Sequence, residues 1–157
     1  MEERIIKTVI SVCHYQELTE ADRHLVDRAF EMTHHSYSPY SHFSVGAAVR
    51  LNNGKVFEGC NQENAAFGVT ICAERTALFA AGAAEPNTPI EAIAIAARGT
   101  NGELVEEPVS PCGSCRQALI ETEMRGKQQV HIILCGKDKF YIMEGIRNLM
   151  PLSFTEF

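Results

Sequence analysis

Two apolar runs in the second half of the chain constrain its fold more than any other feature. The run IEAIAIAAR (90–98) has Ile or Ala at almost every position, and VHIILC (130–135) is similarly apolar. A strand with apolar side chains on both faces has to be covered on both faces, which happens when helices flank a sheet. The two runs therefore predict interior strands of an α/β protein.

The other segments alternate between helical and extended patterns. Thr19, three residues before Asp22, opens a predicted helix within 18–37 that Ser38-Pro39 stops. The runs 43–51 and 55–60 flank an Asn-Gly pair and predict a hairpin. We also expect helices at 72–85, 112–124 and, as a short one, 144–150, and a short strand at 139–143. Strands alternating with helices predict an α/β sandwich around one sheet.

The length of 157 residues suits one domain, which we predict to span residues 1–157. Residues 1–15 are treated as an N-terminal extension of uncertain structure, because their pattern fits an edge strand or a helix. Their apolar run is short, is broken by Lys7 and lacks a cleavage site, so we expect neither a signal peptide nor a membrane-spanning helix. A cytoplasmic location is the default expectation.

The charge of the chain bears on its partners. The formal net charge is −6, and there is no block of Lys or Arg that would bind phosphate backbones. We therefore expect a small-molecule partner and neither nucleic acid nor a membrane.

Three of the six cysteines form a candidate metal site. Cys112 and Cys115, in SPCGSC, are three residues apart at a predicted helix start and so share one face. Cys72 lies at another predicted helix start, where the helix dipole favours the thiolate. Three thiolates predict a zinc site with an open fourth position, which is typical of catalytic zinc. Cys13, Cys60 and Cys135 are interpreted as small buried residues, and His34-His35 is given no ligand role.

Glu74 is the candidate catalytic residue, because it follows Cys72 by two positions and would lie beside the open coordination position. The combination of C-x-E with P-C-x-x-C is typical of zinc nucleobase deaminases, here with Cys in place of the first His. Three thiolates and Zn²⁺ sum to −1, so Arg75 and Arg116 are candidates for withdrawing charge from the sulfurs. The alternative is a zinc-stabilised binding module, which would need a fourth ligand and would have no use for Glu74.

Five stretches make the chain resemble the cytidine deaminases of the small, homotetrameric, three-cysteine class. They lie between about Tyr37 and Phe154 and are YSPYSHFSVGAAV, GCNQENAAFG, CAERTALF, SPCGSCRQ and LMPLSF. The resemblance implies a three-layer α/β/α sandwich around one mixed β-sheet of about five strands. It also implies one Zn²⁺ per chain and a homotetramer with its sites at subunit interfaces.

The resemblance also implies roles for individual residues. Asn61 and Glu63 would bind the 3′-hydroxyl side of a ribose, for which an amide and a carboxylate are suitable partners. Phe43 would pack on the pyrimidine, and Phe154 would reach a neighbouring subunit's site. The backbone around Ala73 and Ser110 would contact the pyrimidine edge and the departing amine.

The implied activity is zinc-dependent hydrolytic deamination of cytidine and 2′-deoxycytidine to uridine and 2′-deoxyuridine, with release of ammonia, as in pyrimidine salvage. Glu74 would take a proton from the attacking water and deliver protons to N3 and to the leaving amine. A blasticidin S-type or other aminopyrimidine nucleoside deaminase is the alternative, and Glu63 favours a plain ribonucleoside over it. An RNA- or DNA-editing deaminase is disfavoured by the acidic charge and by Cys72, where those enzymes mostly have His.

Overall fold

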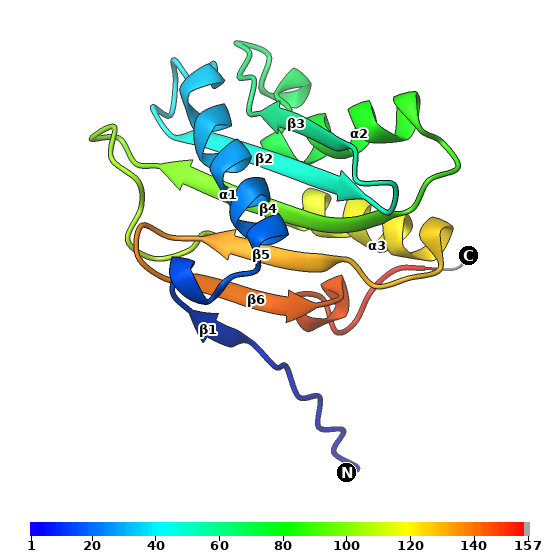
Figure 1. Ribbon diagram of the computed structural model, residues 1–157. Helices are drawn as coiled ribbons and strands as arrows, with labels where there is room; N and C mark the ends of the chain where they lie inside the picture. Colours follow the sequence, from blue (N-terminus) through cyan, green and yellow to red (C-terminus); the bar gives the residue numbers. More distant parts are fainter. Residues whose placement is uncertain (156–157) are drawn as a thin grey trace.

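One six-stranded sheet forms the centre of the computed structural model, which describes residues 1–155 (Figure 1). The strands are β1 Ser11–Cys13, β2 Ser44–Leu51, β3 Val56–Cys60, β4 Ile90–Arg98, β5 His131–Cys135 and β6 Phe140–Glu144. Their order is β1-β6-β5-β4-β2-β3. The pair β4–β5 is parallel and the other neighbouring strands are antiparallel, so the sheet is mixed, as expected.

Helices cover both faces of the sheet. Helix α1 (Glu20–Met32) lies on one face, and α2 (Ala73–Ala84) and α3 (Gly113–Gly126) lie on the other (Figure 1). Short 3₁₀ helices are η1 Tyr15–Glu17, η2 Thr33–His35, η3 Phe67–Val69 and η4 Ile146–Asn148. The predicted three-layer α/β/α sandwich is thus confirmed.

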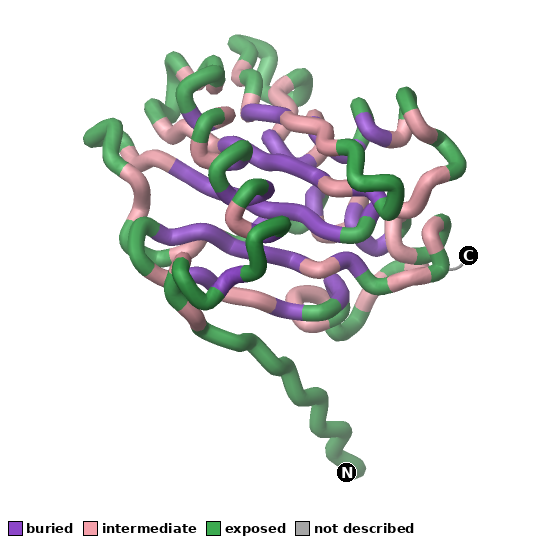
Figure 2. Tube along the Cα trace, in the orientation of Figure 1, coloured by how far each residue is buried: buried purple, intermediate pink, exposed green. Residues whose placement is uncertain are grey.

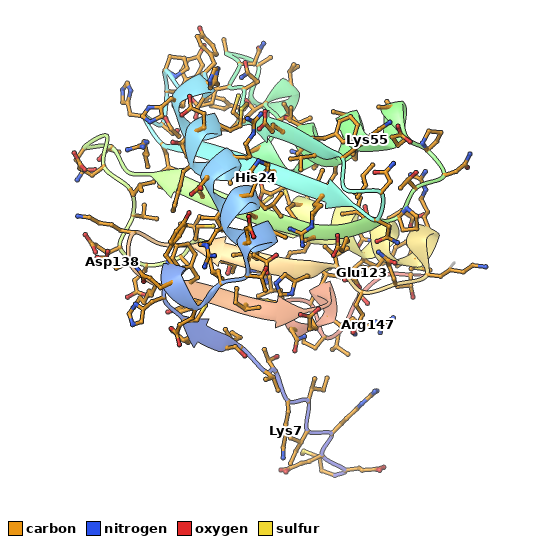
Figure 3. The ribbon with its side chains drawn as sticks, viewed as in Figure 1. Lys7, His24, Lys55, Glu123, Asp138 and Arg147 are labelled. Atoms are coloured by element: carbon orange, nitrogen blue, oxygen red, sulfur yellow. The ribbon has the colours of Figure 1, made fainter. Side chains whose placement is uncertain are left out.

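The sheet has six strands where about five were expected. The additional strand is β1, which pairs with β6 at the sheet edge. Of the two alternatives for residues 1–15, an edge strand or a helix, the structure has the edge strand. Residues 1–10 have no helix or strand and extend away from the sheet, with exposed side chains that include the labelled Lys7 (Figure 3).

Strand β4 explains how the two faces of the sheet differ. Ala92, Ala94 and Ala96 face α1, whereas Ile93 and Ile95 face the layer of α2 and α3. Small side chains under α1 allow a close approach of helix and sheet, and the larger Ile side chains fill the opposite core. The central strands are accordingly buried along most of their length (Figure 2).

The first helix begins as predicted but ends earlier. Thr19 is the N-cap, and its Oγ1 accepts a hydrogen bond from Asp22 N at 3.1 Å. The α-helix ends at Met32 instead of continuing towards Ser38, because Thr33 Oγ1 donates to Phe30 O at 2.6 Å and the chain tightens into η2. The extended backbone at Ser36 then leads the chain towards the candidate site.

The remaining predicted elements are present. Gly54 has φ +80° in the turn between β2 and β3, which agrees with the hairpin expected from Asn-Gly. The short helix expected near 144–150 is η4. In the part of the chain from residue 1 to 155, none of the helices is long and apolar enough to cross a membrane.

Candidate active site

Two helix starts bring the three cysteines of the predicted metal site together. Cys72 is the N-cap of α2 and Cys112 is the N-cap of α3, and neither side chain makes a capping hydrogen bond. Cys115 is buried in the first turn of α3. Both helices lie on the same face of the sheet and begin at the same end of it (Figure 1), so three sulfurs converge between two positive helix ends.

The spacing of the sulfurs fits zinc. The Sγ atoms of Cys72 and Cys112 are 3.7 Å apart, and those of Cys112 and Cys115 are 3.5 Å apart. All three atoms lie within 4.8 Å of one another. Tetrahedral zinc with Zn–S bonds of about 2.3 Å separates its sulfur ligands by about 3.8 Å. Among the residues described, this is the one cluster of three or more His, Cys, Asp or Glu side chains arranged for a metal ion.

The charges of the thiols are coupled. The pKa of Cys72 is lowered to about 5, because the Cys115 thiol and the Arg75 guanidinium hydrogen-bond to its sulfur. The pKa of Cys115 is raised by the same contact with Cys72 and by burial. The cluster therefore stabilises one thiolate by itself, and a divalent cation would favour ionisation of all three thiols.

The two arginines that were candidates for withdrawing charge occupy different surroundings. Arg75 Nη2 lies 3.8 Å from Cys72 Sγ, and its buried Nε has no hydrogen-bond partner among the described residues. Arg116 instead donates to Pro111 O at 2.8 Å and to Leu149 O at 2.6 Å. Its guanidinium thus links the C-terminal segment to the loop before α3. Of the two arginines, Arg75 is the one that contacts a cysteine sulfur.

Glu74 is 4% exposed, and its carboxyl group lines a cavity beside the sulfurs. Burial raises the pKa of this carboxyl group, and the negative charge of Cys72 adds to the effect. A carboxyl group whose pKa is raised towards neutrality can both accept and return a proton near neutral pH.

The cavity has a volume of about 300 Å³ and contains most of the residues predicted to bind a substrate. The predicted residues that line it are Phe43, Asn61, Glu63, Cys72, Glu74, Ser110 and Cys112. Ala73 is fully buried at the start of α2. Phe154 does not line this cavity; its carbonyl accepts a hydrogen bond from Gln117 Nε2 at 2.8 Å, and its side chain is 63% exposed.

Some lining residues were not predicted from the sequence. Ser41, Thr70 and Val109 also line the cavity. Glu63 Oε2 accepts from Tyr40 N at 2.8 Å and from Ser41 N at 3.2 Å. The contact with the Ser41 side chain, together with these backbone donors, lowers the pKa of Glu63. Tyr40 and Ser41 lie in YSPYSHFSVGAAV, one of the stretches that carry the family resemblance. No residue pattern, however, indicates which backbone N–H groups bind a carboxylate.

Comparison with known proteins agrees with this arrangement. Residues 19–130 match the model of the family described as "Cytidine and deoxycytidylate deaminase zinc-binding region". The chain belongs to this family. The matched residues include the three clustered cysteines and Glu74, so the cofactor of this cytidine deaminase family member is Zn²⁺.

Similar proteins cover most of the chain. A cytidine deaminase from Halalkalibacterium halodurans is 44% identical over 140 residues, which span 83% of this chain and 92% of the relative. A probable cytidine deaminase from Dictyostelium discoideum is 38% identical over 131 residues, 83% of this chain and 82% of the relative. The crystal structure of cytidine deaminase from Burkholderia pseudomallei has a TM-score of 0.73 at 39% identity, and the match covers 87% of this chain and all of that one.

Proposed function

We propose that this protein deaminates cytidine and 2′-deoxycytidine hydrolytically, converting the nucleoside and water to uridine or 2′-deoxyuridine and ammonia. The observation that supports this most is a single cavity lined by thiolate ligands, a buried carboxyl group and an amide–carboxylate pair. The family membership and the names of the relatives support the same reaction.

Each part of the cavity has a chemical task in this proposal. Cys72, Cys112 and Cys115 would hold zinc, which when bound supplies a Lewis acid that activates water. Glu74 accepts a proton from the attacking water and passes it to N3 of the base. It then takes the second proton of that water from the hydroxyl group formed at C4 and delivers it to the amino group, which leaves as ammonia while C4 becomes a carbonyl. Arg75 withdraws electron density from Cys72 Sγ.

The rest of the cavity orients the nucleoside. Phe43 packs on the pyrimidine, and Asn61 and Glu63 bind the sugar hydroxyl. The backbone around Ala73 and Ser110 contacts the pyrimidine edge and the departing amine. Together these contacts would place C4 of the base beside Glu74.

The test combines metal content with ammonia release. Purified protein is expected to contain about one zinc per chain and to release ammonia from cytidine and deoxycytidine. Glu74→Gln should keep the zinc and lower kcat by about 10³-fold or more, because the proton carrier is removed without a change in side-chain size. Glu121→Gln, an exposed change on α3, is the control and should match the wild type.

Two results would contradict this proposal. Wild-type kcat in Glu74→Gln would remove Glu74 from proton transfer. Bound zinc without ammonia release from either nucleoside, but with release from blasticidin S, would favour the alternative aminopyrimidine deaminase.

We also propose a homotetramer in which Phe154 reaches a neighbouring subunit's site. Support comes from large apolar side chains that are exposed in the isolated chain; these include Phe67, Val69, Phe79, Leu152 and Phe154, all at least 56% exposed. Where such side chains gather into a contiguous patch, the surface typically binds another protein chain.

A further inference from the structure

The side-chain amide of Asn61 has an orientation fixed by three partners. Its Oδ1 accepts from Val45 N at 2.8 Å, and its Nδ2 donates to Phe43 O at 2.9 Å. A backbone N–H can only donate and a carbonyl can only accept, so these contacts determine which end of the amide is oxygen. The third partner is Ser36, whose Oγ lies 2.5 Å from Asn61 Oδ1 and donates to it.

These contacts nearly exhaust the hydrogen-bonding capacity of the amide. An asparagine side chain can accept twice at Oδ1 and donate twice at Nδ2. Val45 and Ser36 use both acceptor positions, and Phe43 uses one donor position. What remains for a ligand is one N–H of Asn61. Glu63, which lines the same cavity, has an ionised carboxylate that can only accept.

We propose that Ser36 is a positioning residue that makes Asn61 a pure hydrogen-bond donor towards the substrate. The sugar hydroxyl then has to accept from Asn61 and donate to Glu63 at the same time. The site thereby selects a hydroxyl group over a hydrogen atom or an ether oxygen at that position. This inference rests on the proposed function, because it assumes that the cavity binds a nucleoside.

Two further serines lie beside Ser36. Ser38 Oγ lies 3.2 Å from Ser36 Oγ, and Ser44 Oγ lies 3.2 Å from Ser38 Oγ. Ser38 Oγ and Asn61 Oδ1 are thus both acceptors for the single proton of Ser36, and Asn61 Oδ1 is the nearer of the two, which favours donation to Asn61.

Equilibrium binding of the product and of its deoxygenated analogue tests this inference without requiring turnover. The dissociation constants of uridine and 3′-deoxyuridine are measured by calorimetry for the wild type and for Ser36→Ala. We expect Ser36→Ala to weaken uridine binding by about 5- to 10-fold, because the substitution removes one hydrogen bond that holds the amide. Binding of 3′-deoxyuridine should change by less than about 2-fold, because this ligand lacks the hydroxyl that Asn61 and Glu63 contact.

The controls separate positioning from damage to the fold. Ser36→Thr keeps a hydroxyl and should restore uridine binding, and Ser11→Ala on the exposed edge strand should change neither constant. The melting temperature is measured for each variant. An equal loss of affinity for both nucleosides, or no loss for either, would overturn the role of Ser36.

Failure of the proposed function would look different. A wild-type protein that contains zinc but releases no ammonia from cytidine, while its variants still show the hydroxyl-dependent loss, would refute the deamination and retain the role of Ser36. Turnover of cytidine, together with an equal loss of affinity for uridine and 3′-deoxyuridine in Ser36→Ala, would retain the deamination and refute the role of Ser36.

Discussion

Glu63 is an example of a side chain whose chemistry is set by its neighbours. The Ser41 side chain and the N–H groups of Tyr40 and Ser41 stabilise its ionised form and lower its pKa. A group with a lowered pKa stays charged above its folded-state value and loses that charge only as the pH falls through it. Glu63 is therefore a permanent acceptor at neutral and mildly acidic pH.

Glu63→Gln should raise KM for cytidine by about 10- to 100-fold, because a charged acceptor for the sugar hydroxyl becomes a neutral one. In the wild type, KM for cytidine should stay constant from about pH 7 to pH 5, since the folded-state pKa lies below the ordinary value of 4.5. Steady-state kinetics over this range measure both effects, with the exposed Glu31→Gln as a control. A KM that already rises between about pH 6 and 5 would contradict the assigned protonation state.

At the scale of elements, the metal site depends on close packing between β3 and the start of α2. A Cβ atom on Gly59 would lie 2.5 Å from Ala77 N and 2.6 Å from Ala73 O. Both are backbone atoms, which cannot move without moving the helix. This close approach fixes the first turn of α2, which begins after Cys72 and contains Glu74.

Gly59→Ala should lower the free energy of unfolding by about 3 kcal/mol, because α2 has to move away from the sheet. Gly82→Ala, on the same helix, should raise it by up to about 1 kcal/mol, because Gly82 has no neighbour within 4 Å of the added methyl group and Ala favours helix. Urea denaturation of both variants measures these changes. If both substitutions lowered, or both raised, the free energy of unfolding, the packing described for α2 would be contradicted.

The sequence predicts elements well where a strong local pattern agrees with the tertiary structure. Thr19, the Asn-Gly turn and the two apolar strands are of this kind. The end of α1 at Met32 was not predictable, because it depends on a local bond from Thr33 to Phe30 that competes with the helix. The edge strand β1 is not predictable either, because three residues have too little pattern to distinguish strand from helix.

The candidate site shows the same division. The three cysteines and Glu74 stand in short motifs at two predicted helix starts, and the match of these motifs to the zinc deaminases predicts that they share one site. Ser36 and Arg116 act on partners distant in sequence, namely Asn61 and Leu149. Such pairings depend on how loops meet in space, which no local pattern contains.

At the scale of the whole molecule, the exposed apolar side chains bear on assembly. Light scattering should give a mass of about 70 kDa, four times the 17.4 kDa of one chain. Phe154→Ala should lower activity strongly while the mass stays the same, and Ile5→Ala, in the N-terminal extension and 81% exposed, is the control. Full activity in Phe154→Ala would contradict a role in any site.

Mixing two inactive variants tests whether Phe154 serves a neighbour. Tetramers assembled from Glu74→Gln and Phe154→Ala chains would contain some sites with an intact Glu74 from one chain and an intact Phe154 from another. Activity should therefore reappear on mixing and reassembly, measured as ammonia release. If Phe154 acts only within its own chain, the mixture stays inactive.

The position of the cysteines in the chain has a further consequence for heat resistance. Cys72 and Cys112 are separated by 40 positions, and β4 lies between them. An ion bound to both sulfurs would close this segment into a loop and so reduce the conformational entropy of the unfolded polypeptide while it remained bound. Zinc at this site would thus act as a cross-link between two helices as well as a participant in chemistry.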